Sequence, residues 1–189
     1  MWPWEHVAVG YIAYSLLHRG YTDRPPRAGA VLAVAFGSLF PDLVDKPLGW
    51  AFGVLPSISV GHSVFLAVPL GTLIVVVTGH SGRADVGVAF LVGHLLHIPG
   101  DIVYPLVLGG SSAPERFLWP LYSGTVADAG FMSKVVLYLT DFMVFLGTPR
   151  GRLYLACELV LVGTAITLWV ADRLPVASDV LRWTREHAG

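Results

Sequence analysis

Long apolar segments separated by short polar turns are the feature that most constrains how this chain can fold. The apolar segments span about residues 5–19, 28–44, 63–78, 85–108, 133–147 and 153–171. Arginine and proline gather in the turns between them, as in Arg24-Pro25-Pro26-Arg27 and Pro149-Arg150-Gly151-Arg152. Only 13% of the residues are charged, whereas a soluble domain carries about 25%. The sequence therefore predicts a polytopic membrane protein.

The predicted fold class is an all-α membrane helical bundle with about six helices. Several apolar segments are shorter than the roughly 20 residues of a perpendicular span, and Pro99 and Pro105 lie inside the fourth segment. We therefore expect some helices to be short or kinked. The length suits a single integral membrane domain over residues 1–189. Within it, residues 1–108 carry the predicted metal site and residues 173–189 form a polar tail.

The fourth segment places two histidines and an aspartate in apolar surroundings, in Gly93-His94-Leu95-Leu96-His97-Ile98-Pro99-Gly100-Asp101. On a helix, the three polar side chains lie within an arc of about 60°. Such groups are costly in lipid and mark a cavity, a partner or a metal. His97 and Asp101, at positions i and i+4, can bind one ion from a single helix face. His94, one turn earlier, is either a further ligand or a polar group that supports one.

The alternating direction of successive helices predicts which other polar groups reach this motif. The start of the first helix, the end of the second and the start of the third all reach the same membrane face as the end of the fourth. Histidine and aspartate occur at each of these positions, and they are ligands for zinc and other divalent metals. We expect one or two zinc ions, with manganese as the other candidate. The predicted metal ligands are His6, Asp42, Asp45, His62, His97 and Asp101.

Basic residues give a prediction of orientation. By the positive-inside tendency, the face richer in arginine is cytoplasmic, and the metal site then faces outward. The residues expected on the cytoplasmic face are Arg19, Arg24, Arg27, Arg83, Arg150 and Arg152. The residues expected on the metal-site face are Lys46, Arg116, Lys134, Arg173, Arg182 and Arg185.

Several sequence motifs match a known family. They are His6 with the small-residue helix after it, Gly37-Ser38-Leu39-Phe40-Pro41-Asp42-Leu43-Val44-Asp45-Lys46-Pro47, Gly61-His62-Ser63, Gly93-x-x-x-His97-x-x-x-Asp101 and Leu118-Trp119-Pro120. On these motifs the chain resembles the YdjM-like family of membrane-bound metal-dependent hydrolases over about its first two-thirds. The order His, Asp, His, His-x-x-x-Asp is also similar to zinc-dependent phospholipase C.

The phospholipase resemblance implies a ligand arrangement. Either Asp42 or Asp45 would hold the first metal together with His62, His97 and Asp101. Asp101 would bridge to a second metal shared with His6. The phospholipase pattern continues with a further His/His/Glu set, which is not found after Asp101 in this sequence.

The expected function is hydrolysis of a phosphoester in a lipid-like substrate by a metal-activated water. Asp42, Asp45 and Asp101 are the predicted catalytic residues, and Lys46 and Ser63 are the predicted substrate-binding residues. The expected partners are membrane lipid and the lipid-like substrate. Nucleic acid is excluded, because the net charge is near neutral and the chain has no basic block.

Two other functions use the same residues. In a metal-ion or proton transporter, the His/Asp cluster is a transit site, and Asp141 and Glu158 in the last two helices continue the path. In a non-catalytic protein, the metal only joins the helices. For Asp141 and Glu158 themselves, we expect an ion pair with an arginine of the nearby Arg150–Arg152 turn.

Overall fold

The computed structural model describes residues 1–126 and 130–187, and the regular secondary structure of this part of the chain is entirely helical, without strands. The predicted all-α class is confirmed, with seven α-helices in place of about six. One π-helix (η1) and one 3₁₀-helix (η2) complete the fold. The elements are α1 (Pro3–Thr22), α2 (Ala28–Lys46), η1 (Pro47–Ala51), α3 (Val64–His80), α4 (Ala84–Val107), η2 (Pro114–Leu118), α5 (Phe131–Leu146), α6 (Pro149–Ala171) and α7 (Ala177–His187).

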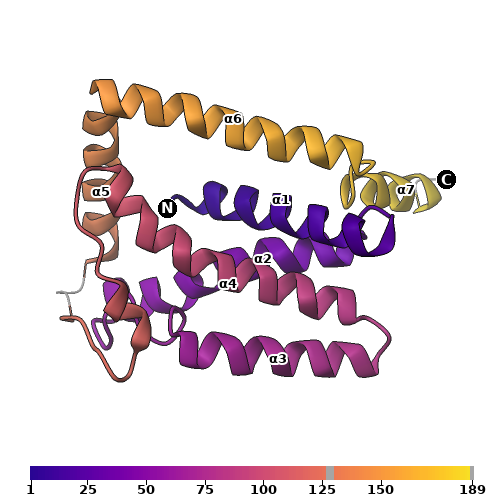
Figure 1. Ribbon diagram of the computed structural model, residues 1–189, viewed down its shortest axis with the longest axis horizontal. Helices are drawn as coiled ribbons and strands as arrows, with labels where there is room; N and C mark the ends of the chain where they lie inside the picture. The colour runs from indigo at the N-terminus through magenta and orange to yellow at the C-terminus, as the bar shows by residue number, and fades with distance from the viewer. Residues whose placement is uncertain (127–129, 188–189) are drawn as a thin grey trace.

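Three helical stretches in the described residues are long and apolar enough to cross a membrane. They are Ala28–Ala51, which joins α2 to η1, and the helices α4 and α6. The apolar helix α3 is shorter, with 17 residues. Helices α1 to α4 and α6 run along the long axis of the molecule, α5 lies across one end, and α7 lies at the other end (Figure 1).

Helix α4 is the central helix, because it packs against α1, α2 and α3. Glycines bring its backbone close to that of α2. A Cβ atom on Gly37 of α2 would collide with the carbonyl group of Phe90, and a Cβ atom on Gly93 of α4 would collide with the carbonyl oxygen of Val34. Small residues allow such close approach between membrane helices. The two helices that carry most of the predicted ligands are therefore held rigidly together.

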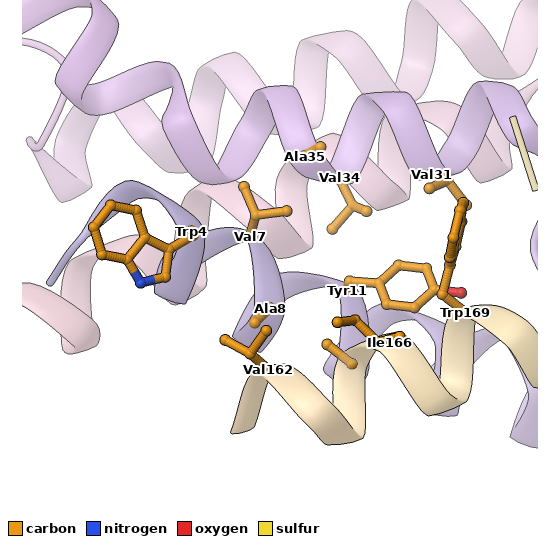
Figure 2. Close-up of a pocket in the computed structure, with 11 residues that line it drawn as sticks. Trp4, Val7, Ala8, Tyr11, Val31, Val34, Ala35, Val162, Ile166 and Trp169 are labelled. Carbon is orange, nitrogen blue, oxygen red and sulfur yellow. The ribbon is translucent and has the colours of Figure 1, made fainter. Parts of the chain in front are cut away.

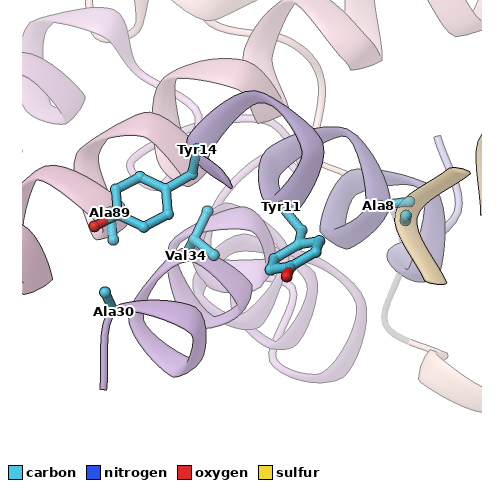
Figure 3. Packing of buried hydrophobic residues seen from close by; sticks show 7 residues of the cluster. Ala8, Tyr11, Tyr14, Ala30, Val34 and Ala89 are labelled. Atoms are coloured by element: carbon cyan, nitrogen blue, oxygen red, sulfur yellow. The ribbon is translucent and has the colours of Figure 1, made fainter. Parts of the chain in front are cut away.

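The main apolar cluster lies between α1, α2 and α4 (Figure 3). Tyr11 and Tyr14 of α1 pack there beside Val34 of α2, and Ala30 and Ala89 complete the buried layer. Val34, Ala30 and Ala89 have no exposed surface. This layer makes the part of the interior between these helices mainly apolar.

The expected positions of the basic residues that flank the last two helices are wrong. Helix α5 crosses the end of the bundle instead of running along it (Figure 1), so α6 starts at the end where α4 finishes. Consequently Arg150 and Arg152 lie at the metal-site end, and the tail from Arg173 onward lies at the other end. Of the 12 basic residues, the end opposite the metal site carries Arg19, Arg24, Arg27, Arg83, Arg173, Arg182 and Arg185.

A buried ion pair fixes α6 on α1 at this arginine-rich end. Asp172 has a fully buried side chain and forms an ion pair with Arg19, whose Nε donates to its carboxylate at 2.6 Å. The hydroxyl groups of Tyr11 and Ser15 donate to the same carboxylate at 2.6 and 2.5 Å. A buried carboxylate requires such compensation. The sequence analysis did not identify Asp172.

Candidate metal centre

Four predicted ligands from three separate segments meet at the end of the bundle where α2 and α4 finish. Asp42 comes from α2, His62 from the connection before α3, and His97 and Asp101 from α4. One possible ligand atom from each residue lies within 4.8 Å of all the others. His62 and His97 are fully buried, whereas the side chains of Asp42 and Asp101 keep 17% and 13% of their surface exposed. The cluster is therefore enclosed but reachable from the carboxylate side.

The distances within the cluster match the spacing of ligands around a small cation. The Nε2 atoms of His62 and His97 lie 3.1 Å apart. Nε2 of His62 lies 3.4 Å from Oδ1 of Asp42 and 3.4 Å from Oδ2 of Asp101. The corresponding distances from His97 are 3.8 and 3.3 Å. Ligand atoms held tetrahedrally at 2.0–2.1 Å from a zinc ion lie about 3.3 Å from one another.

Hydrogen bonds on the far side of both imidazoles turn their Nε2 atoms into the cluster. Nδ1 of His97 donates to the carbonyl oxygen of Ser38 at 2.7 Å, and Nδ1 of His62 donates to Oδ2 of Asp45 at 2.8 Å. A neutral imidazole that donates through Nδ1 presents a lone pair at Nε2. This arrangement is the usual support for histidine ligands of metals. Two facing lone pairs 3.1 Å apart require a cation or a proton between them.

The electrostatics of the cluster favour positive charge. Burial opposes a charge on His62, but the surrounding carboxylates, Asp101 first among them, outweigh burial and raise the pKa of His62 to about 10. Oδ1 of Asp42 is buried and accepts no hydrogen bond, although Nζ of Lys46 lies 3.2 Å away. A buried carboxylate oxygen without a donor is unusual in a folded protein. The donor set therefore suits a divalent cation.

Asp45 lies behind His62 and outside the four-residue cluster. Its carboxylate accepts hydrogen bonds from the backbone N–H groups of Ser59 at 2.6 Å, Gly61 at 2.9 Å and His62 at 3.2 Å, in addition to the ring of His62. Both oxygens are therefore engaged. Asp45 was predicted to be a metal ligand and a catalytic residue, whereas the structure places it behind His62, where it orients that ring and holds the connection that carries it.

His6 lies beside the cluster and contacts the other oxygen of Asp101. Its Nε2 lies 3.1 Å from Oδ1 of Asp101, while Oδ2 faces His62 and His97. The ring of His6 stacks on that of His97, with centroids 3.7 Å apart, and its Nδ1 has no hydrogen-bond partner. The amino group of Met1 also contacts Oδ1, at 2.6 Å. Asp101 thus divides its two oxygens between two sets of partners, as a bridging carboxylate does.

The sequence of the whole bundle matches one family. The family model described as YdjM inner membrane protein matches residues 1–175. The chain belongs to the YdjM inner membrane protein family. Comparisons with curated proteins and with solved structures gave no match. Family membership and the apolar helices together make the chain an integral protein of the inner membrane.

The two predicted substrate-binding residues of this YdjM protein occupy different environments. Lys46 lies next to Asp42, and its Nζ is 4.8 Å from the centroid of the Trp50 ring. About a quarter of its side chain is exposed, so it can meet a ligand. Ser63 is fully buried, and its hydroxyl donates to the carbonyl oxygen of Trp119 at 2.5 Å. Its role in substrate binding stays a prediction.

His94 supports the cluster from outside. Its Nε2 donates to the carbonyl oxygen of Gly61 at 2.8 Å, which holds the residue before His62. His94 lies outside the group of possible ligands. Of the two roles considered for it, the structure places it in the supporting one.

The acids of the last two helices do not form the expected arginine pairs. Glu158 accepts a hydrogen bond from Nε1 of Trp4, and Asp141 is exposed on α5. Among the described residues, neither acid forms an ion pair. Glu5, which the sequence analysis did not identify, is 97% buried next to His6. It accepts hydrogen bonds from the backbone N–H of Trp2 at 2.6 Å and from the hydroxyl of Tyr154.

Proposed function

We propose that this YdjM protein is a membrane-embedded, metal-dependent hydrolase that cleaves a phosphoester in a lipid-like substrate. One observation carries the proposal. Two histidines, His62 and His97, are each held through Nδ1 so that their Nε2 atoms converge at 3.1 Å, beside two carboxylates. Such support of ligand rings is typical of metal sites.

Asp42, His62, His97 and Asp101 would hold the metal. Two nitrogen and two oxygen ligands within 4.8 Å of one another suit zinc, and manganese accepts the same donors. A second ion would be held by Asp101 and His6, in place of the amino group of Met1 that contacts Oδ1 of Asp101. A divalent metal at this position supplies a water of lowered pKa and polarises a phosphoryl oxygen. In this proposal Asp42 and Asp101 touch the reacting groups, and Asp45 positions His62.

The position of Lys46 favours a phosphoester as the bond that the protein cleaves. Its ammonium group lies at the exposed side of the cluster, 3.2 Å from Asp42, and a lysine binds phosphate as a point charge. The cluster lies in the second half of the spanning stretch Ala28–Ala51 and of helix α4, about six to ten residues before each of them ends. A substrate that reaches this position from the bilayer carries its phosphate near the membrane surface and its chains in the hydrocarbon. A phospholipid or an isoprenoid phosphate has this form.

The interior of the bundle argues against transport. Toward the arginine-rich end, the space between α1, α2 and α4 is filled by the apolar cluster, in which Ala30, Val34 and Ala89 are fully buried. An ion leaving the metal centre in that direction would meet mainly apolar side chains there, and charges in such surroundings are costly. The positive-inside tendency still places the metal centre outside, because seven of the 12 basic residues lie at the opposite end.

Metal content and turnover test the proposal together. The protein is purified without chelator as wild type, His97→Ala, Asp101→Ala and the control His80→Ala, whose side chain is exposed at the opposite end of α3. We expect one or two equivalents of metal in the wild type and the control, and loss of metal in both cluster variants. Cleavage of phospholipids into a diacylglycerol or free head-group alcohol and a phosphomonoester, and phosphate release from isoprenoid phosphates, should be lost in the same two variants.

Two outcomes would overturn the proposal. One is a folded wild-type protein without metal. The other is a metal-loaded protein that turns over none of these phosphoesters and loses thermal stability when the metal is removed. That combination is expected when a metal only joins the helices.

A further inference from the structure

An apolar groove lies between α1, α2 and α6, away from the metal centre (Figure 2). Its volume is about 280 Å³. Trp4, Val7 and Tyr11 of α1 form one wall, and Val162, Ile166 and Trp169 of α6 form the facing wall. Because α6 packs on α1 and not closely on α2, the groove follows the line where α6 leaves the bundle.

The groove runs parallel to the helices. Helices α1 and α6 point in the same direction (Figure 1). The step from Trp4 to Tyr11 on α1 and the step from Val162 to Trp169 on α6 are both seven residues, which corresponds to a length of about 10 Å. Tyr11, Val31 and Trp169 lie together at one end of the groove, and Trp4 lies at the other (Figure 2). The groove is therefore aligned with the spanning helices.

The polar atoms of the aromatic lining residues are engaged elsewhere. Nε1 of Trp4 donates to Glu158, the hydroxyl of Tyr11 donates to Asp172 at 2.6 Å, and Nε1 of Trp169 donates to the carbonyl oxygen of Pro175 at 3.0 Å. The remaining lining side chains are valine, isoleucine and alanine. A ligand in the groove consequently meets carbon atoms and is itself apolar.

The groove is separate from the proposed catalytic site. His6 faces Asp101 of α4, whereas Trp4 and Tyr11 point about 140–160° away around the axis of α1. A chain that lies in the groove therefore does not need its head group at the metal centre. Binding of a ligand in the groove is therefore independent of the proposed hydrolysis.

The dimensions favour a single hydrocarbon chain. A volume of about 280 Å³ is that of a small ligand pocket, and it extends over about 10 Å along the helices, which suits a linear chain. The groove is lined by α2 and α6, which both qualify as membrane spans, so its open side is continuous with the bilayer.

We propose that this groove binds one acyl chain of a membrane phospholipid, which fills the space between α6 and the α1–α2 pair. The chain completes the packing of α6 on α1. The acyl chain contacts the face of α6 that packs on α1, which is also the face held by the ion pair between Arg19 and Asp172. It thereby supports α1, the helix that carries His6.

Photolabelling in vesicles tests the inference. The full chain is reconstituted in phosphatidylethanolamine and phosphatidylglycerol that contain a phospholipid with a diazirine in its acyl chain. Adducts are mapped by peptide mass spectrometry. We expect adducts on the segments 4–11 and 162–169 at about five times the level on the lipid-facing segment 72–77 of α3, which corresponds to about 1 kcal/mol of preference.

Two matched variants on α6 distinguish a specific binding site for an acyl chain from general contact with lipid. Ile166→Trp fills the groove, and Val160→Trp places the same side chain on α6 outside it. Both residues are more than half exposed, at 54% and 70%, so neither substitution disturbs buried packing. Ile166→Trp should abolish the excess labelling, and Val160→Trp should leave it unchanged. Asp101→Asn, which removes a proposed catalytic group, should label like the wild type.

Two results would overturn the inference. One is equal labelling of all lipid-facing segments, or equal loss in both tryptophan variants, which means lipid contact without a site. The other is a dimer in native mass spectrometry that Ile166→Trp dissociates, which means that a second copy of the chain occupies the groove.

Discussion

Nδ1 of His62 donates a hydrogen bond to Oδ2 of Asp45 at 2.8 Å, within a fully buried contact. This bond fixes the opposite nitrogen of the ring toward Asp42, His97 and Asp101. The same carboxylate accepts backbone hydrogen bonds from Ser59 and Gly61. One aspartate therefore shapes the connection before α3 and orients the histidine that this connection carries.

Asp45→Asn should weaken metal binding without abolishing it. An amide keeps most of the volume but has one acceptor oxygen, so the ring of His62 loses its charged partner. Loss of such a supporting group lowers metal affinity about 10–100-fold. Metal titration followed by elemental analysis measures the effect. Asp42→Asn, which changes a proposed ligand, should lose the metal altogether, and equal loss in both variants would make Asp45 a ligand.

The position of the cluster could be predicted from the sequence because it depends on helix direction alone. Helices α1 to α4 alternate in direction along the bundle (Figure 1), so the start of α1 and the end of α4 meet. The i, i+4 spacing of His97 and Asp101 places both on one helix face. Their Nε2 and Oδ2 atoms lie 3.3 Å apart in the structure.

The division of roles within the cluster could not be predicted in this way. Asp42 and Asp45 are three residues apart on one helix, and this spacing does not show which of them contacts Nε2 of His62 and which contacts Nδ1. The support of His97 is a backbone carbonyl, that of Ser38, which has no sequence signature. The direction of α5 could not be predicted from the sequence either, because an apolar helix of 16 residues can run along a bundle or cross its end.

Lys46→Met should raise the KM for a phosphoester substrate while the metal content stays unchanged. The substitution keeps the length of the side chain but removes the charge beside Asp42. An increase in KM of about tenfold corresponds to about 1.4 kcal/mol of lost binding. Lys46→Arg should restore most of the affinity. Lys134→Met, at the same end of the molecule on α5, is the control, and an equal effect of both methionine variants would indicate a general loss of surface charge.

Gly37→Ala should destabilise the protein and weaken metal binding together. The new methyl group would collide with the carbonyl group of Phe90 and push α2 away from α4, the helices that carry Asp42 and His97. Overpacking of this kind costs about 1–3 kcal/mol. Thermal unfolding in detergent and metal titration measure the two effects. Gly163→Ala on α6 is the matched control, because no heavy atom lies within 4 Å of its Cβ position. A normal metal affinity in Gly37→Ala would contradict the coupling of the two helices to the site.

Asp172→Asn should lower stability more than any other single change at the arginine-rich end. The substitution leaves Arg19 without a charged partner and leaves a single acceptor oxygen for Arg19, Tyr11 and Ser15. Because Arg19 keeps 36% of its side chain exposed, we expect a loss of about 1–3 kcal/mol, the cost of leaving buried polar groups without a partner. The exposed pair of Asp179 and Arg182, 3.0 Å apart on α7, provides the control, because exposed pairs contribute little. If Asp172→Asn and Asp179→Asn melt at the same temperature, the carboxylate of Asp172 does not hold α6 on α1, and apolar packing along α1 must do so alone.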